Sequence, residues 1–125
     1  MMRTAAIALS LAGLAFIPAS VALAENAPPS YQADPSVYKV IFEDDHFRVI
    51  SATWKAGQTD KAHSHPVPSI AYGLSTCTLK LQDADGKTRE AMPKKGAATT
   101  VPITASHTAT NTGTKTCHAL LIERK

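Results

Sequence analysis

Three of the five histidines in this chain have a spacing that suits metal chemistry. His63 and His65 are separated by one residue, and His107 follows about forty residues later. Side chains alternate along an extended segment, so two imidazoles at positions i and i+2 point to the same side. A third imidazole from another strand would complete a set of three neutral nitrogens, leaving further positions on a divalent ion open to water or substrate. The spacing therefore predicts a metal site.

Short β-type runs separated by turn-forming residues must position these histidines. We predict strands over residues 37–42, 47–54, 70–74, 77–81, 99–102 and 116–122. Asp85-Gly86 lies between residues 78–81 and 88–91 and predicts a hairpin there. No stretch beyond the N-terminal segment has a sustained helical period. Many short strands at regular spacing predict an all-β sandwich or small barrel in a single domain.

The N-terminal segment has the features of a secretory signal peptide. Arg3 lies in a short basic start, residues 5–17 are almost entirely apolar, and Ala22-Leu23-Ala24 is an A-x-A cleavage signal. The apolar run is short for an uncleaved membrane anchor. We therefore expect a signal peptide over residues 1–24, a periplasmic or secreted protein, and no membrane association after cleavage. Residues 25–36, which contain three prolines, are expected to form a flexible or extended lead-in to a domain over 37–125.

The charge pattern disfavours nucleic acid as a partner. Thirteen basic and ten acidic residues give a net charge of +3, and the two signs are interspersed without a basic run. A small-molecule ligand or substrate is the expected partner.

Cys77 and Cys117 are the only cysteines. Export to an oxidising compartment would allow a disulfide between them, joining two strands that are distant in sequence. The alternative is that Cys77, which alternates with two leucines, is a small buried apolar residue. The sequence does not choose between the two, because the backbone separation that a disulfide needs cannot be judged from spacing.

Residues around the histidines extend the pattern into two motifs. The first is G-x5-H-x-H and the second is G-x5-P-x4-H-x3-N; their fixed positions are Gly57, His63, His65, Gly96, Pro102, His107 and Asn111. In this order the two motifs resemble those of the cupin superfamily, and the resemblance covers essentially residues 37–122. It implies a double-stranded β-helix, or jelly-roll barrel, in which the three histidines converge on a divalent metal. It also implies a homodimer paired through its sheets.

The chain departs from the cupin pattern at three positions. The glutamate ligand of the family falls at Ser69, or at Ile70 with the longer spacing. Thr104 replaces the glycine of the second motif, and Thr76 the closing glycine of the first. Without the carboxylate, three neutral imidazoles give a more electrophilic site with more open positions, suited to Fe, Zn, Mn, Ni or Cu. The alternative is that the loss of this ligand abolished metal binding.

Other polar and aromatic residues have open roles. Ser69 could hold a metal-bound water. Tyr72 and Trp54 could line a pocket or belong to the core. Asp60 could accept a hydrogen bond from an imidazole N–H, or lie solvated in a loop. For the remaining candidates we favour structural roles, namely a turn for Asn111, the surface for His46, and a satisfied core or rim position for His118.

Three function classes remain open from the sequence. The first is a metal-dependent enzyme on a small organic substrate; some cupin-like thiol dioxygenases use three-histidine iron, so dioxygenation is included by analogy. The second is a noncatalytic protein that binds a metal or small ligand. The third is an interaction module without a metal. No serine or cysteine nucleophile with a partnered base is visible, so the catalytic residues stay unassigned.

Overall fold

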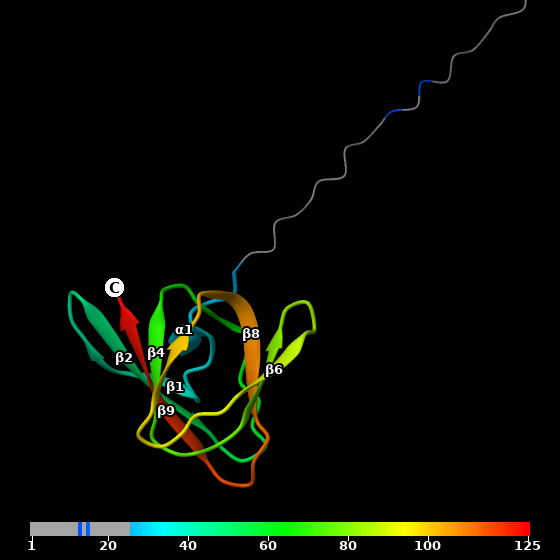
Figure 1. Cartoon of the computed structure of the whole chain (residues 1–125). Coiled ribbons are helices and arrows are strands. Elements are labelled where there is room, and N and C mark those ends of the chain that lie inside the picture. The colour runs from blue at the N-terminus through cyan, green and yellow to red at the C-terminus, as the bar shows by residue number, and fades with distance from the viewer. Residues whose placement is uncertain (1–12, 14, 16–25) are drawn as a thin grey trace, which may run out of the picture.

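The computed structural model describes residues 13, 15 and 26–125, and the chain folds as an open barrel of strands (Figure 1). Apart from positions 13 and 15, the expected signal peptide over residues 1–24 lies outside the described residues. Among the helices described, none combines the length and the apolar character needed to cross a bilayer.

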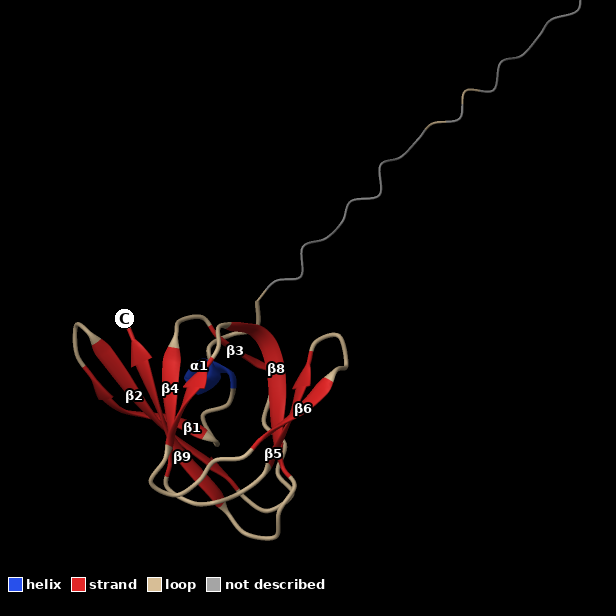
Figure 2. Ribbon diagram, viewed as in Figure 1, coloured by secondary structure: helices blue, strands red, loops and turns tan. Residues whose placement is uncertain are grey.

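Nine strands and one short helix make up the described domain (Figure 2). In chain order they are α1 (Ser30–Ala33), β1 (Tyr38–Glu43), β2 (Phe47–Trp54), β3 (His63–His65), β4 (Ser69–Gly73), β5 (Leu79–Asp83), β6 (Thr88–Ala91), β7 (Ala98–Val101), β8 (Thr104–Asn111) and β9 (Cys117–Arg124).

The strands form two antiparallel sheets that face each other across the core. One sheet has the order β1-β2-β9-β4-β7, and the other has the order β3-β8-β5-β6. Side chains alternate between the inner and outer faces, as in β9, where every second residue from Cys117 to Glu123 is buried. Ile50, Trp54, Leu81 and Leu121 belong to the core between the sheets. The all-β, single-core architecture predicted from the sequence is confirmed.

Most predicted strands lie within two residues of the observed ones, and β2 matches from Phe47 to Trp54. The hairpin around Asp85-Gly86 is also confirmed, since β5 pairs with β6 across it. Two observed strands, β3 and β8, lie outside the strand ranges predicted from the sequence, and the longer of them is β8. Its inward positions carry His107, Ala109 and Asn111 in place of large apolar side chains, so the usual alternation of apolar and polar residues is absent.

The segment expected to be a flexible or extended lead-in, residues 25–36, packs against the barrel over its described part. The amide of Ser64 in β3 donates to the carbonyl of Pro28, and the amide of Ala27 donates to the carbonyl of Ala105. Residues Ser30–Ala33 form α1, and Ser30 is buried. Side-chain periodicity does not reveal this packing, because backbone groups make it, the carbonyl of Pro28 with β3 and the amide of Ala27 with β8. This pairing helps to hold the strand that carries two of the histidines.

Gly57 and Gly96, the two glycines of the motifs, have φ angles of 76° and 81°. Both lie in the left-handed region, which glycine adopts without steric cost. The conformation of each turn therefore accounts for the glycine, independently of any chemistry.

Cys77 and Cys117 form a disulfide, with their Cα atoms 5.6 Å apart. Cys117 begins β9 in the five-stranded sheet, and Cys77 lies two residues before β5 in the four-stranded sheet. The disulfide therefore joins the two sheets, and the alternative of a free buried thiol at Cys77 is excluded.

Candidate metal centre

His63, His65 and His107 come together inside the barrel. The first two lie in β3, and His107 lies opposite His63 in the paired strand β8. All three side chains are buried, and one ligand nitrogen from each lies within 4.8 Å of the others. The rings pack edge to face in all three pairs. The structure thus brings together the three histidines that the spacing singled out.

The Nε2 atoms of the cluster lie too close together for hydrogen bonds alone to account for them. His107 Nε2 is 3.0 Å from His65 Nε2 and 3.0 Å from His63 Nε2. A ring nitrogen either donates one hydrogen or accepts through one lone pair, so it makes one such bond well. A second nitrogen at the same distance is left facing it without a hydrogen bond. A cation between the three nitrogens would satisfy all their lone pairs at once.

The separations suit a shared ion. Nitrogens bound at about 2.1 Å to one ion lie about 3.0 Å apart in octahedral geometry and about 3.4 Å apart in tetrahedral geometry. His107 Nε2 lies 3.0 Å from each of the other two Nε2 atoms. The buried cluster therefore fits a divalent metal, with the three Nε2 atoms as its ligands.

The His63 ring is oriented by the protein. Its Nδ1 lies 2.9 Å from the carbonyl oxygen of Lys61. A carbonyl only accepts hydrogen bonds, so Nδ1 carries the hydrogen and, in the neutral ring, Nε2 presents its lone pair to the cluster. The Nδ1 atoms of His65 and His107 are buried and have no hydrogen-bond partner among the described residues. Ring packing is what orients those two imidazoles.

Asp60 is a buried residue next to His63 whose carboxylate accepts three hydrogen bonds. Its Oδ2 accepts hydrogen bonds from the Tyr38 hydroxyl at 2.6 Å and from Trp54 Nε1 at 3.0 Å, and its Oδ1 accepts one from the Ala109 amide at 2.7 Å. Oδ1 also lies 3.6 Å from Nδ1 of His63. The alternative of a solvated loop residue is therefore wrong. Asp60 ties β1, β2 and β8 to the loop that leads into the histidine strand.

Tyr38 is a site residue that the sequence did not reveal. Its hydroxyl oxygen lies 3.2 Å from Nε2 of His63. Burial raises the pKa of Tyr38 well above its usual value, and the adjacent Asp60 carboxylate raises it further. The hydroxyl donates its one hydrogen to Asp60, so it does not donate to His63, and the lone pair of His63 Nε2 stays available to the cluster. A tyrosine at the start of an ordinary strand gives no signal of such a role.

His65 and His107 are held neutral near physiological pH. Burial, with smaller contributions from the charges of His63 and Arg89, lowers the pKa of His65 to about 4. Burial likewise lowers the pKa of His107 to about 3, with smaller contributions from His63, His65 and Arg89. A metal ligand must be the neutral imidazole, so this environment favours coordination.

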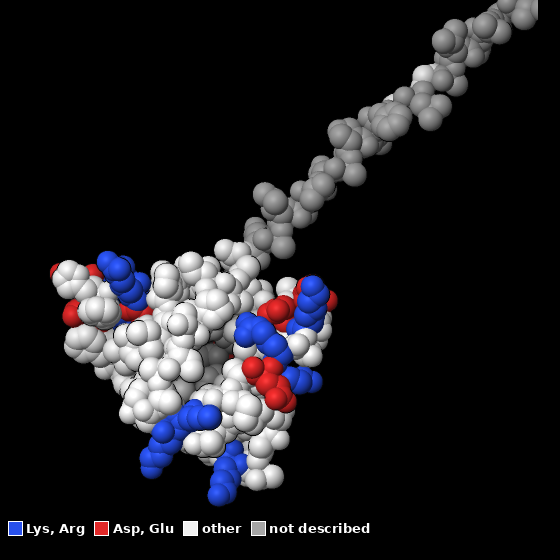
Figure 3. Space-filling view, viewed as in Figure 1, with Lys and Arg blue, Asp and Glu red and all other residues white. Residues whose placement is uncertain are grey.

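A cavity of about 280 Å³ lies next to the cluster between the two sheets. His65, His107 and Tyr38 form part of its wall, and Arg89 lies in the wall contributed by β6. The rest is mostly apolar and includes Leu79, Leu81, Leu121, Val101 and Met92. The molecule is hollowed on this face, beside charged side chains of the β5–β6 hairpin (Figure 3). The arrangement can hold a small, largely apolar molecule against the histidines.

Ser69 and Tyr72 do not line this cavity. Ser69 is buried, but its hydroxyl donates to the carbonyl of Val67 at 3.0 Å. Tyr72 faces outward from β4 with 38% of its surface exposed, because alternation puts Ala71 on the inner face instead. Tyr72 therefore lies outside the lining of this cavity and outside the buried core. Trp54, for which pocket and core roles were both open, has both, since it is buried and lines the cavity.

The remaining candidates have structural roles. Asn111 is buried, donates to the carbonyls of Trp54 and Lys115, and accepts from the Gly113 amide, which confirms it as a turn residue. His46 lies exposed in the turn between β1 and β2. His118 is half-buried, with Nε2 3.0 Å from the Ser51 hydroxyl.

The chain is similar to known proteins in its three-dimensional structure but not in its sequence. No protein-family model and no curated protein matches the chain. A cupin domain from Bordetella pertussis Tohama I is similar in structure, with a TM-score of 0.65 and 18% identity, over 82% of this chain and 99% of that one. An RmlC-like cupin family protein with a double-stranded β-helix fold, from Methanocaldococcus jannaschii, has a TM-score of 0.57 and 12% identity, over 70% of this chain and 78% of that one. The chain thus has the double-stranded β-helix fold of the cupin superfamily, with a buried three-histidine cluster that could hold a metal.

Proposed function

We propose that the protein binds one divalent metal ion through the Nε2 atoms of His63, His65 and His107 and uses it on a small organic substrate held in the adjacent cavity. The observation that carries this proposal is the position of His107 Nε2, 3.0 Å from both other Nε2 atoms. Neutral imidazoles cannot satisfy that geometry among themselves, whereas one shared cation does.

The protein and the metal would have separate tasks. When bound, the metal supplies Lewis acidity or a centre for oxygen chemistry. Asp60 and Lys61 orient the His63 ring, the apolar wall excludes water, and the cavity positions a substrate beside His65 and His107. Reactions open to such a site include dioxygenation, isomerisation, carbon–carbon or carbon–oxygen lysis and decarboxylation.

A noncatalytic metal- or ligand-binding protein is the second candidate. One observation favours it, namely that no aspartate or glutamate is among the residues lining the cavity. The cavity wall therefore offers no carboxylate to act as a general base in a reaction that needs one. Oxygen uptake and product analysis with a panel of thiols, phenols and sugar acids would separate the enzyme from the binder.

Metal analysis of the purified mature protein tests the metal site directly. We expect about one equivalent of metal, after reconstitution where needed, and loss of most of it in His63→Gln, His65→Gln and His107→Gln. Glutamine approximates the size of the imidazole and limits the cavity left behind. His46→Gln is the matched control, because His46 is exposed and remote from the cluster. A reconstituted parent protein without metal would overturn the proposal.

We also propose that the protein works outside the cytoplasm, in the periplasm or beyond. The Cys77–Cys117 disulfide supports this location, because such bonds persist in oxidising compartments. Cell fractionation followed by N-terminal sequencing of the recovered protein should give a mature chain that begins near Glu25. Recovery of the full-length chain in the cytoplasm with reduced cysteines would contradict the assignment.

A further inference from the structure

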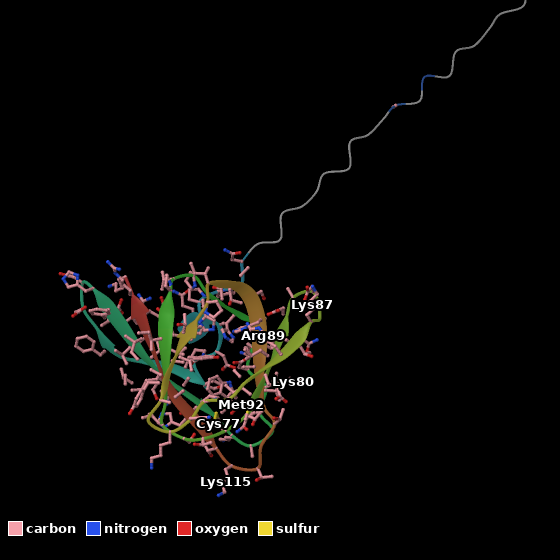
Figure 4. The ribbon with its side chains drawn as sticks, viewed as in Figure 1. Cys77, Lys80, Lys87, Arg89, Met92 and Lys115 are labelled. Atoms are coloured by element: carbon pink, nitrogen blue, oxygen red, sulfur yellow. A yellow bond between two sulfur atoms is a disulfide. The ribbon has the colours of Figure 1, made fainter. Side chains whose placement is uncertain are left out.

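Arg89 is the one lysine or arginine among the residues that line the cavity. It lies in β6 opposite Leu81, which in turn lies opposite Ala109 of β8. Leu81 and Ala109 both face the barrel interior, so the pairing puts Arg89 on the same inner face of the sheet. Ala109 is the next inward-facing residue of β8 after His107. Figure 4 shows Arg89 beside the opening between the sheets, whereas Lys87 lies near the tip of the hairpin.

The guanidinium of Arg89 is poorly satisfied within the protein. Its one ion-pair partner among the described residues is Asp83, at 3.9 Å, and the two side chains are 44% and 38% exposed. Exposed pairs at this separation contribute little. Arg48 provides the contrast, since it has carboxylate oxygens of Glu43 at 2.7 Å and Glu123 at 3.2 Å. Arg48 is committed to the fold, whereas the fork of donors on Arg89 is available to a ligand.

The positive charge at the cavity favours an anionic ligand. Arg89 contributes one positive charge and the proposed metal would contribute two more. Asp83 lies 3.9 Å from Arg89 and Asp60 lies behind His63, but no carboxylate is part of the cavity wall itself. An anionic ligand would be attracted by both positive charges, so it binds such a site better than its neutral analogue.

We propose that Arg89 binds the carboxylate of a small organic acid whose apolar part occupies the cavity beside His65 and His107. The inference rests on the proposed function for the nearby metal, but the contact with Arg89 does not require it. Arginine pairs with carboxylates through two parallel hydrogen bonds, which also fixes the orientation of the ligand. The apolar wall and the volume of about 280 Å³ select a compact, hydrocarbon-rich acid over a sugar acid.

Trp54 provides the measurement, because it is the only tryptophan in the chain and it lines the cavity. Its fluorescence would be titrated with butyrate and benzoate, and with the neutral amides butyramide and benzamide. Wild type, Arg89→Gln, Arg89→Lys and the control Lys87→Gln would be compared with Zn(II) bound and without metal. Lys87 is 84% exposed in the same hairpin, so its loss removes an equal charge away from the cavity.

We expect the wild type and Lys87→Gln to bind each carboxylate at least roughly tenfold more tightly than its amide, as charge-assisted hydrogen bonds do. Arg89→Gln should lose this preference, and Arg89→Lys should keep part of it. Equal binding of acid and amide by the wild type, no binding of either, or an unchanged preference in Arg89→Gln would overturn the inference. Metal content measured on the same samples separates the two proposals. If the protein binds no zinc, the metal proposal fails. In that case a preference for carboxylate over amide that depends on Arg89 still supports the carboxylate site, and the lack of such a preference overturns it.

Discussion

The Tyr38 hydroxyl donates a 2.6 Å hydrogen bond to Asp60 Oδ2, and through this pair β1 is joined to the loop that begins the histidine strand. Both side chains are buried. The same hydroxyl oxygen lies 3.2 Å from His63 Nε2, so the pair connects the packing of the barrel to the geometry of the metal centre. Changes to either residue should therefore affect stability and the site to different extents.

Asp60→Asn should destabilise the fold. The carboxylate accepts three hydrogen bonds from Tyr38, Trp54 and Ala109, and an amide group can replace only one oxygen as an acceptor. At least one buried donor then faces the NH2 group, at a cost of about 2–3 kcal/mol. Thermal unfolding should show the midpoint lowered by roughly 10 °C or more. Asp85→Asn in the exposed hairpin is the control. Equal unfolding midpoints for the two variants would show that the hydrogen bonds of Asp60 do not stabilise the fold.

Tyr38→Phe should separate structural support from metal ligation. Removing the hydroxyl takes one hydrogen bond from Asp60, which still accepts from Trp54 and Ala109, so we expect a loss of about 1 kcal/mol in the free energy of unfolding. The three imidazoles remain, and the variant should bind the same equivalents of metal as the parent. Loss of stoichiometric metal in this variant would show instead that the Tyr38 oxygen is itself a ligand.

The Cys77–Cys117 disulfide should contribute about 2–4 kcal/mol to stability, because it closes a loop with a sequence separation of 40. The double variant Cys77→Ser/Cys117→Ser, or the parent after reduction, should unfold at lower denaturant concentration. Neither cysteine lines the cavity, so metal stoichiometry well below the unfolding transition should not change. An unchanged midpoint on reduction would show that packing alone joins the two sheets.

The metal-free protein should lose stability as the pH falls below about 6.5. In the fold, burial lowers the pKa of His65 to about 4 and that of His107 to about 3, whereas both rings protonate near pH 6.5 in the unfolded chain. Between these values the unfolded state binds more protons than the native state, so stability rises with pH in this window and is fully present above it. Urea unfolding from pH 7.5 to pH 4 measures the effect.

The two histidines can be tested in the same experiment. The double variant His65→Gln/His107→Gln should show a much flatter dependence of unfolding free energy on pH, since these buried titrating groups are gone. The variant is compared with itself across pH, so an overall loss of stability does not affect the comparison. A slope equal to that of the parent would assign the pH dependence to other groups.

The sequence by itself determined the features that depend on local spacing and backbone chemistry. Alternation in an extended segment put His63 and His65 on one side, and turn residues marked most of the strands. The conformation of Gly57 and Gly96 is likewise a local property, because a left-handed φ selects glycine wherever the turn occurs.

Only the tertiary structure decided the features that depend on pairing between distant segments. Tyr38 and Arg89 lie in ordinary strands, and they reach the centre and the cavity wall only because β1 packs over Asp60 and β6 pairs with β5. Residues 27–34 gave no periodic signal because backbone groups, and not an apolar face, join this segment to the barrel, at Pro28 with β3 and at Ala27 with β8. The disulfide also required the fold, since the distance of 5.6 Å between the two Cα atoms follows from the closed barrel and not from their sequence separation of 40.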